Sequence, residues 1–91
     1  MQGRIRVVFV APFLLDATVR FVKAVAEVPG CELALITQEP RAKIPAAIAA
    51  RLKIHYQVAD AFDPGVLVAA IKAIAPALGG VDRLLGTLEQ L

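Results

Sequence analysis

Continuous aliphatic runs alternate with amphipathic stretches along the chain. Residues 4–10, Arg-Ile-Arg-Val-Val-Phe-Val, begin with alternating polar and apolar positions and end in an unbroken apolar run. This pattern predicts a central parallel strand that is buried on both faces. Similar but shorter patterns, bounded by turn-forming residues, predict three further strands at residues 31–37, 54–58 and 81–85.

Between the first two strands the polar positions take helical spacing. Arg20, Lys23 and Glu27 follow one another at intervals of three and four residues, with apolar residues around the rest of the circumference. This spacing predicts an amphipathic helix over residues 17–28. Asp16 precedes the helix and is its expected N-cap, and the Pro-Gly pair that follows is expected to end it.

Two further helices are predicted from the residues at which they begin. Pro45 suits a first helical position and precedes an Ala-rich helix over residues 46–52. Asp63 and Pro64 together are typical of an N-cap followed by proline at the first helical position. We expect this third helix to be ended or kinked at Pro76.

Strands that alternate with helices predict an α/β fold with a parallel sheet and right-handed crossovers. We expect residues 1–91 to form one domain, a three-layer, Rossmann-like half with four strands in the order 3-2-1-4. The first two helices should cover one face of the sheet, and the third should cover the other. A helix to cover the fourth strand is lacking, so we expect the chain to be a fragment of a longer protein.

The composition is unusually aliphatic, because 58% of the residues are hydrophobic against about 45–50% in average proteins. Either both sheet faces are covered or some apolar surface serves a contact outside the chain, such as a homo-oligomer through an exposed sheet face. The longest apolar run, residues 7–15, is interrupted by Pro12 and is too short for a membrane span. The single cysteine cannot form an internal disulfide, which favours a cytoplasmic location.

The basic residues give a net charge of +2 and are mostly scattered. Arg41, Lys43, Arg51 and Lys53 lie close together in the sequence, but no aromatic residue stands among them. A nucleic-acid interface usually combines clustered cations with aromatic side chains. We therefore interpret this group as a solvated edge and expect no nucleic-acid partner.

The loop after the first strand argues against dinucleotide binding. Residues 11–16, Ala-Pro-Phe-Leu-Leu-Asp, contain none of the glycines that let a backbone approach a pyrophosphate. Asp16 also places a negative charge where a phosphate would lie. Glu39, beyond the second strand, has the position of a ribose-binding acid, but without the glycines this interpretation is disfavoured.

No constellation of residues predicts a complete active site. Asp60 and Asp63 follow the third strand, yet the capping role of Asp63 leaves too few acidic ligands for Mg²⁺. His55 lies in the middle of a strand without a recognisable partner, so an edge or half-exposed position is favoured over catalysis. Cys31 lies at the amino side of the sheet and is interpreted as a packing residue.

The remaining candidate site is the carboxyl edge of strands one and four, where ligands gather in α/β folds. Its two loops are residues 12–16 and 86–90. Gly86 permits a sharp departure of the chain from the strand. The Thr87 hydroxyl either caps a following helix or contacts a ligand. The Glu89 carboxylate either binds an amine or interacts favourably with the dipole of that helix. The candidate substrate-binding residues are Pro12, Asp16, Gly86, Thr87 and Glu89.

The chain resembles the N-terminal domain of ATP-grasp enzymes, in particular the group of biotin carboxylase and the large chain of carbamoyl-phosphate synthetase. The segments that carry this resemblance are residues 4–10, 33–37 and 81–90. The resemblance covers essentially the whole chain, and the final Gly-Thr-Leu-Glu-Gln carries much of it. It implies a Rossmann-like domain on the substrate side of an ATP-dependent carboxylate ligase. The glycine-rich first loop of biotin carboxylase is absent here.

In that family the full-length enzyme uses ATP and Mg²⁺ to form an acyl-phosphate. The resemblance implies that the groups that hold them lie beyond Leu91, in the remainder of the same enzyme, and that this fragment binds no cofactor and is not catalytic on its own. Two alternatives stay open. The first is a free-standing flavodoxin-like interaction or dimerisation module. The second is half of a glycosyltransferase or of another Rossmann-like enzyme.

Overall fold

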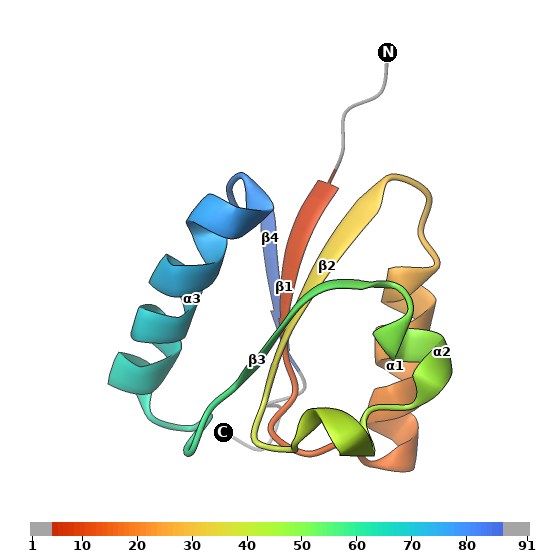
Figure 1. Cartoon of the computed structure of the whole chain (residues 1–91), viewed down its shortest axis with the longest axis horizontal. Coiled ribbons are helices and arrows are strands. Elements are labelled where there is room, and N and C mark those ends of the chain that lie inside the picture. Colours follow the sequence, from red (N-terminus) through yellow and green to blue (C-terminus); the bar gives the residue numbers. More distant parts are fainter. Residues whose placement is uncertain (1–4, 87–91) are drawn as a thin grey trace.

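The sheet has the architecture that the sequence predicts. In a computed structural model, which describes residues 5–86, four parallel strands are arranged in the order β3-β2-β1-β4 (Figure 1). The predicted α/β class and strand order are therefore confirmed. The strands are β1 (Ile5–Val10), β2 (Cys31–Thr37), β3 (Leu52–Gln57) and β4 (Arg83–Gly86).

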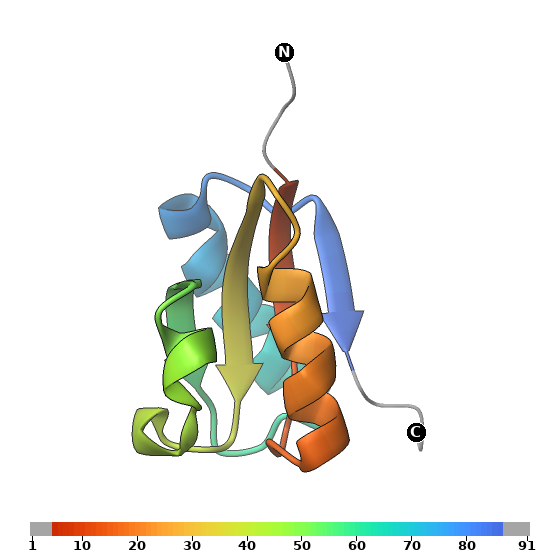
Figure 2. The same cartoon turned by 90° about the vertical axis from the view of Figure 1, so that its right-hand side faces the viewer.

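Helices cover the sheet from both sides, as predicted. Figures 1 and 2 show α1 and α2 together on one face and α3 on the other. A short 3-10 turn, η1, lies between β2 and α2. The helical elements are α1 (Asp16–Ala26), η1 (Arg41–Lys43), α2 (Ala46–Ala49) and α3 (Pro64–Leu78).

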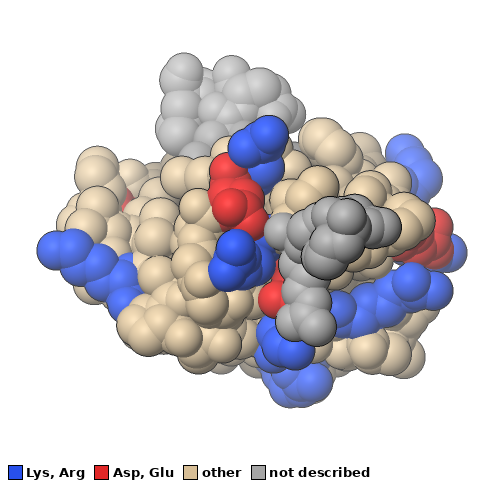
Figure 3. All heavy atoms as spheres, turned by 90° about the horizontal axis from the view of Figure 1, so that it is seen from above, with Lys and Arg blue, Asp and Glu red and all other residues tan. Residues whose placement is uncertain are grey.

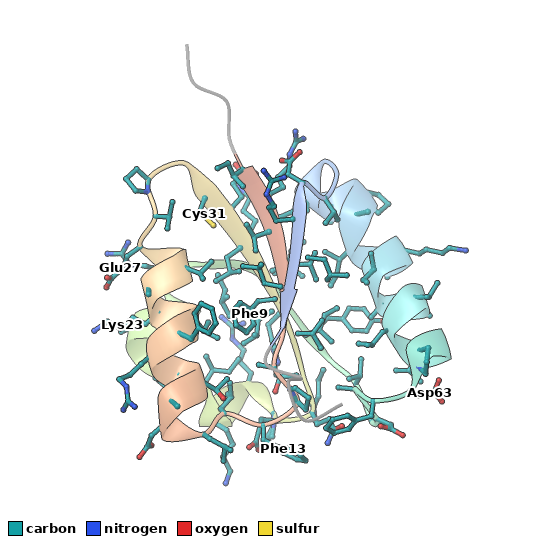
Figure 4. The ribbon with its side chains drawn as sticks, turned by 180° about the vertical axis from the view of Figure 1, so that it is seen from behind. Phe9, Phe13, Lys23, Glu27, Cys31 and Asp63 are labelled. Carbon is teal, nitrogen blue, oxygen red and sulfur yellow. The ribbon has the colours of Figure 1, made fainter. Side chains whose placement is uncertain are left out.

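Successive residues of β1 supply two separate hydrophobic cores. Phe9 packs with residues of α1 and α2, whereas its neighbour Val8 packs with residues of α3. Both side chains are fully buried, because successive side chains of a strand point to opposite faces. Figure 4 shows Phe9 on the α1 side of the sheet. Its ring meets that of Phe21 edge to face at a centroid distance of 5.5 Å.

The prediction for the start of α1 is wrong in one respect. The N-cap is Leu15, which makes no side-chain cap hydrogen bond, and Asp16 is the first helical residue. The Asp16 carboxylate therefore complements the partial positive charge of the helix N-terminus without capping it. The helix ends at Ala26, two residues earlier than predicted, because the following turn tightens and the Val28 N–H donates to the Val25 carbonyl.

The second helix is shorter than predicted and the third strand begins earlier. The predicted helix over residues 46–52 ends at Ala49, where the Arg51 N–H donates to the Ile48 carbonyl and closes a tight turn. Leu52 then pairs with Leu33 of β2. Pairing with a buried strand thus overrides the helical propensity of the Ala-rich segment.

The third helix confirms the predicted cap but not a stop at Pro76. The Asp63 carboxylate accepts hydrogen bonds from the Gly65 and Val66 N–H groups at 2.8 and 3.3 Å. Pro76 lies inside α3, where its missing N–H costs one bond in the last turn. The helix instead ends at Leu78, with Gly79 as its C-cap. The positive φ of Gly79, 88°, lets the next N–H, that of Gly80, reach the Ala75 carbonyl at 2.9 Å.

A polar contact at the amino edge fastens β4 to β1. The Asp82 carboxylate accepts from the Arg6 backbone N–H at 2.9 Å and from Arg6 Nε at 3.2 Å, while the Asp82 N–H donates to the Arg6 carbonyl at 2.8 Å. These Arg6 donors lower the pKa of Asp82. The Arg6 guanidinium also donates to the Gly79 carbonyl. This contact sets where β4 enters the sheet, and the strand begins at Arg83 instead of the predicted residue 81.

The two helix starts give a stability prediction. We expect Asp63→Ala to lower the free energy of unfolding by about 1 kcal/mol, because two N–H groups lose their acceptor. Asp16→Ala is the matched control, since Asp16 is also exposed and lies in a first turn but caps nothing; its cost should stay near 0.3 kcal/mol. Urea denaturation of both variants checks this, and equal losses would contradict it.

Candidate functional site

The carboxyl ends of β1 and β4 lie side by side, as the strand order requires. Val10, the last residue of β1, pairs with Gly86, the last residue of β4. This is the point at which the strand order reverses, where α/β proteins bind ligands. Pro12 and Gly86 therefore come to the same edge of the sheet, although 74 positions separate them in the sequence.

Pro12 serves as a structural anchor in this edge. It is buried, and its carbonyl accepts hydrogen bonds from the Gln38 N–H at 3.1 Å and from Thr37 Oγ1 at 3.2 Å. The Ala11 N–H donates to the Ile36 carbonyl at 2.8 Å. The loop after β1 is thus fixed to the end of β2, and the polar group of Pro12 is already engaged.

Side chains from the loop after β2 extend this connection in both directions. Gln38 Oε1 accepts from the Ala61 N–H at 2.7 Å, which fixes the loop after β3. On the other side, Glu39 Oε2 lies 3.5 Å from the Leu14 N–H. The sequence assigned no role to Gln38 and considered Glu39 only as a ribose-binding acid. Both residues hold three neighbouring loops together, so the edge is preorganised.

Three large hydrophobic side chains are exposed at the carboxyl end of the sheet. Phe13, Leu15 and Phe62 are 47%, 66% and 38% exposed, although all three are large hydrophobic residues. They come from the loops after β1 and β3, and Figure 4 shows Phe13 at the carboxyl end of the sheet, away from the core around Phe9. Such a surface suits an apolar group or a protein partner. The signal available in the sequence was a run of apolar residues in a turn, where polar ones are usual.

The other predicted site residues fall in different positions. Asp16 is exposed in the first turn of α1. Gly86 is exposed and still belongs to β4; among residues 5–86, positive φ angles occur only at Gly30, Gly79 and Gly80. Gly86 therefore shows no left-handed turn at the strand end. Thr87 and Glu89 lie outside the described residues.

The acidic residues that follow β3 are engaged in local structure. Asp60 Oδ1 accepts from the Phe62 N–H at 2.9 Å, and Asp63 caps α3. Between Ile5 and Gly86, no group of three His, Cys, Asp or Glu side chains is placed to hold a metal ion.

Over the same stretch, no helix has the length and apolar character needed to cross a membrane.

His55 is half-buried on β3, the position that the sequence favoured, and it pairs with Leu35 of β2. Burial and the neighbouring Arg41 guanidinium both lower the pKa of its imidazole, while the Glu39 backbone carbonyl acts in the opposite direction. Its Nε2 atom is buried without a hydrogen-bond partner. The folded protein therefore favours neutral His55.

Cys31 is the first residue of β2 and packs, half-buried, against the core on the α1 side. Burial, followed by the Glu32 carboxylate, raises the pKa of its thiol. A thiol is nucleophilic only when it ionises. Cys31 is therefore a packing residue, as predicted.

The His55 imidazole predicts a pH dependence of stability. Since its folded pKa lies below the usual 6.5, the unfolded chain binds more protons, and stability should fall as the pH drops below about 6.5 and through the folded pKa. His55→Gln should flatten this loss between pH 7 and about 5. Urea denaturation across that range checks the prediction, and unchanged pH dependence in the variant would contradict it.

Comparisons of the chain with protein-family models, curated proteins and solved structures found no match. The geometry of the edge and the physical chemistry of its residues therefore provide the basis for a functional proposal.

Proposed function

We propose that the chain is the N-terminal, substrate-side domain of an ATP-dependent carboxylate ligase of the ATP-grasp type, and that it is not catalytic on its own. One observation chiefly supports the proposal. The carboxyl edge at the β1–β4 junction is preorganised by the Pro12, Gln38 and Glu39 contacts, yet it presents apolar side chains in place of a phosphate cradle. Such an edge is suited to shape the acceptor side of a cleft.

The described residues do not fit Mg-ATP. The loop after β1 contains no glycine, so no flexible backbone segment offers its N–H groups to a pyrophosphate. The Asp16 carboxylate at the start of α1 would repel phosphate oxygens. Asp60 and Asp63 are occupied by backbone N–H groups. In the proposed enzyme, ATP and Mg²⁺ are therefore held by residues outside this stretch.

The role left to this chain is to position a substrate and exclude water. An acyl-phosphate is easily hydrolysed, so a closed site that keeps water out protects it. Phe13 and Leu15 supply exposed apolar surface next to the strand ends. Asp16, with Thr87 and Glu89, would provide the polar contacts that orient an acceptor. Gly86 would leave room for the substrate to approach the backbone of β4.

The first test is nucleotide binding by the chain alone. We expect isothermal titration calorimetry of residues 1–91 with Mg-ATP to give no binding tighter than about 1 mM, because the phosphate and metal ligands are missing from residues 5–86. Micromolar binding would contradict this expectation. The gene sequence beyond Leu91 supplies the complementary test. A glycine-rich flap and acidic metal ligands there would support the proposal, and a stop codon directly after Leu91 would refute it.

A second candidate function, a dimerisation module, is favoured by the free edge at β4. The module is not flavodoxin-like, because β1 lies between β2 and β4, whereas in the flavodoxin order strand 1 lies between strands 2 and 3. Leu84 is 57% exposed although its partner on β1, Val8, is fully buried. On the same edge of the sheet, the outward backbone groups of β4 pair with no described strand. Exposed edge strands with apolar side chains readily pair with another copy.

This alternative makes a separate prediction. If the module dimerises through β4, light scattering should give twice the monomer mass, and Leu84→Lys should return the chain to a monomer, since a buried lysine is costly. Val68→Lys is the control, because Val68 is 50% exposed on α3, away from the strand edge. A monodisperse wild-type monomer would exclude dimerisation through β4.

A further inference from the structure

Four cations gather along the opposite edge of the sheet, around β3. Residues 41–53 contain no aspartate or glutamate. Among residues 5–86, the ion pair between side chains joins Arg6 to Asp82, and none of the four cations lies within salt-bridge distance of a described carboxylate. All four are exposed: Arg41, Lys43, Arg51 and Lys53. Their charge is therefore not neutralised within the described part of the chain.

The four cations span the whole length of the edge. Figure 2 shows η1 near the carboxyl ends of the strands, from which the chain rises through α2 to the amino end of β3. Arg41 and Lys43 belong to η1, whereas Arg51 and Lys53 lie at the start of β3. Six strand residues extend over about 20 Å. Seen from the amino end, the side of the molecule with α2 and β3 carries several blue side chains (Figure 3).

The backbone of β3 is available along this strip of charge. β3 pairs with β2 on one side, and no described strand lies on its other side. An edge strand leaves a row of N–H and C=O groups unpaired, which can accept a further strand. His55, in the middle of β3, adds a buried Nε2 atom without a hydrogen-bond partner.

We propose that the edge of β3 binds an acidic, extended segment of another protein, which adds to the sheet as a further strand. Its backbone would pair with that of β3, and its carboxylates would meet Arg51 and Lys53 at one end of the edge and Arg41 and Lys43 at the other. This is the mode of β-strand addition, in which backbone hydrogen bonds provide affinity and side chains provide specificity.

A peptide fits this edge better than a nucleic acid does. Single-stranded nucleic acids bind by stacking their bases on aromatic side chains, and the strip of cations contains no aromatic residue. The nearest one, Tyr56, is half-buried and packs against the core on the α3 side. The unpaired backbone, by contrast, is a feature that a peptide can match and a nucleic acid cannot.

The test uses the full chain and a fluorescent octapeptide of alternating Glu and Val, measured by anisotropy at low salt. We expect saturable binding that weakens as salt is added. The double variant R51E/K53E should bind at least about ten-fold more weakly, since two attractions become repulsions. The matched control R20E/K23E changes the same total charge on α1, where both residues are exposed, and should stay within about two-fold of wild type.

Amide chemical shifts provide the second readout. The peptide should shift the backbone amides of residues 52–57, and circular dichroism should show that both variants are folded. Equal losses in the two double variants would reveal only an effect of net charge and would overturn the proposal. An oligothymidylate that binds as tightly as the peptide, an equally strong alternating Lys and Val peptide, or no peptide binding at all would do the same.

Discussion

The burial of β1 on both faces is the constraint on which the rest of the fold depends. Val8 and Phe9 are adjacent in sequence and fully buried, yet they belong to cores on opposite sides of the sheet. A shift of β1 by one residue would exchange the two sets of side chains and disrupt both cores at once. The position of α1 and α2 on one face, and of α3 on the other, follows from this strand.

The two edges of the sheet are held and protected differently. β4 is placed by the contact between Arg6 and Asp82 at its amino end, and it exposes Leu84. β3 carries cations instead, of which Lys53 is exposed on the strand itself. Charged residues discourage pairing between identical edges because both copies carry the same sign. The β4 edge, where Leu84 is exposed, is thus compatible with a second copy, whereas the basic β3 edge favours a partner of opposite charge.

The sequence predicted the fold best where local and long-range preferences agree. Asp63 and Pro64 favour a helix start that packing also requires, and the continuous apolar run of β1 has no alternative to a central position. The predictions from the sequence failed where the local and the long-range preferences compete. Leu52 is drawn into the sheet by Leu33 despite an Ala-rich helix before it. Leu15 takes the cap position that we expected of Asp16, and Asp16 becomes the first helical residue.

The candidate site was predictable in place but not in chemistry. The pairing of β1 with β4 brings Pro12 and Gly86 to one edge, as the expected strand order 3-2-1-4 requires. The roles of the residues depend on hydrogen bonds between distant loops, which periodicity does not report. The Pro12 carbonyl is engaged by Thr37 and Gln38, so Pro12 shapes the edge and does not bind a ligand through that group. In the proposed function, recognition at this edge would therefore depend on the exposed side chains of the β1 loop, which differ from those of a phosphate site.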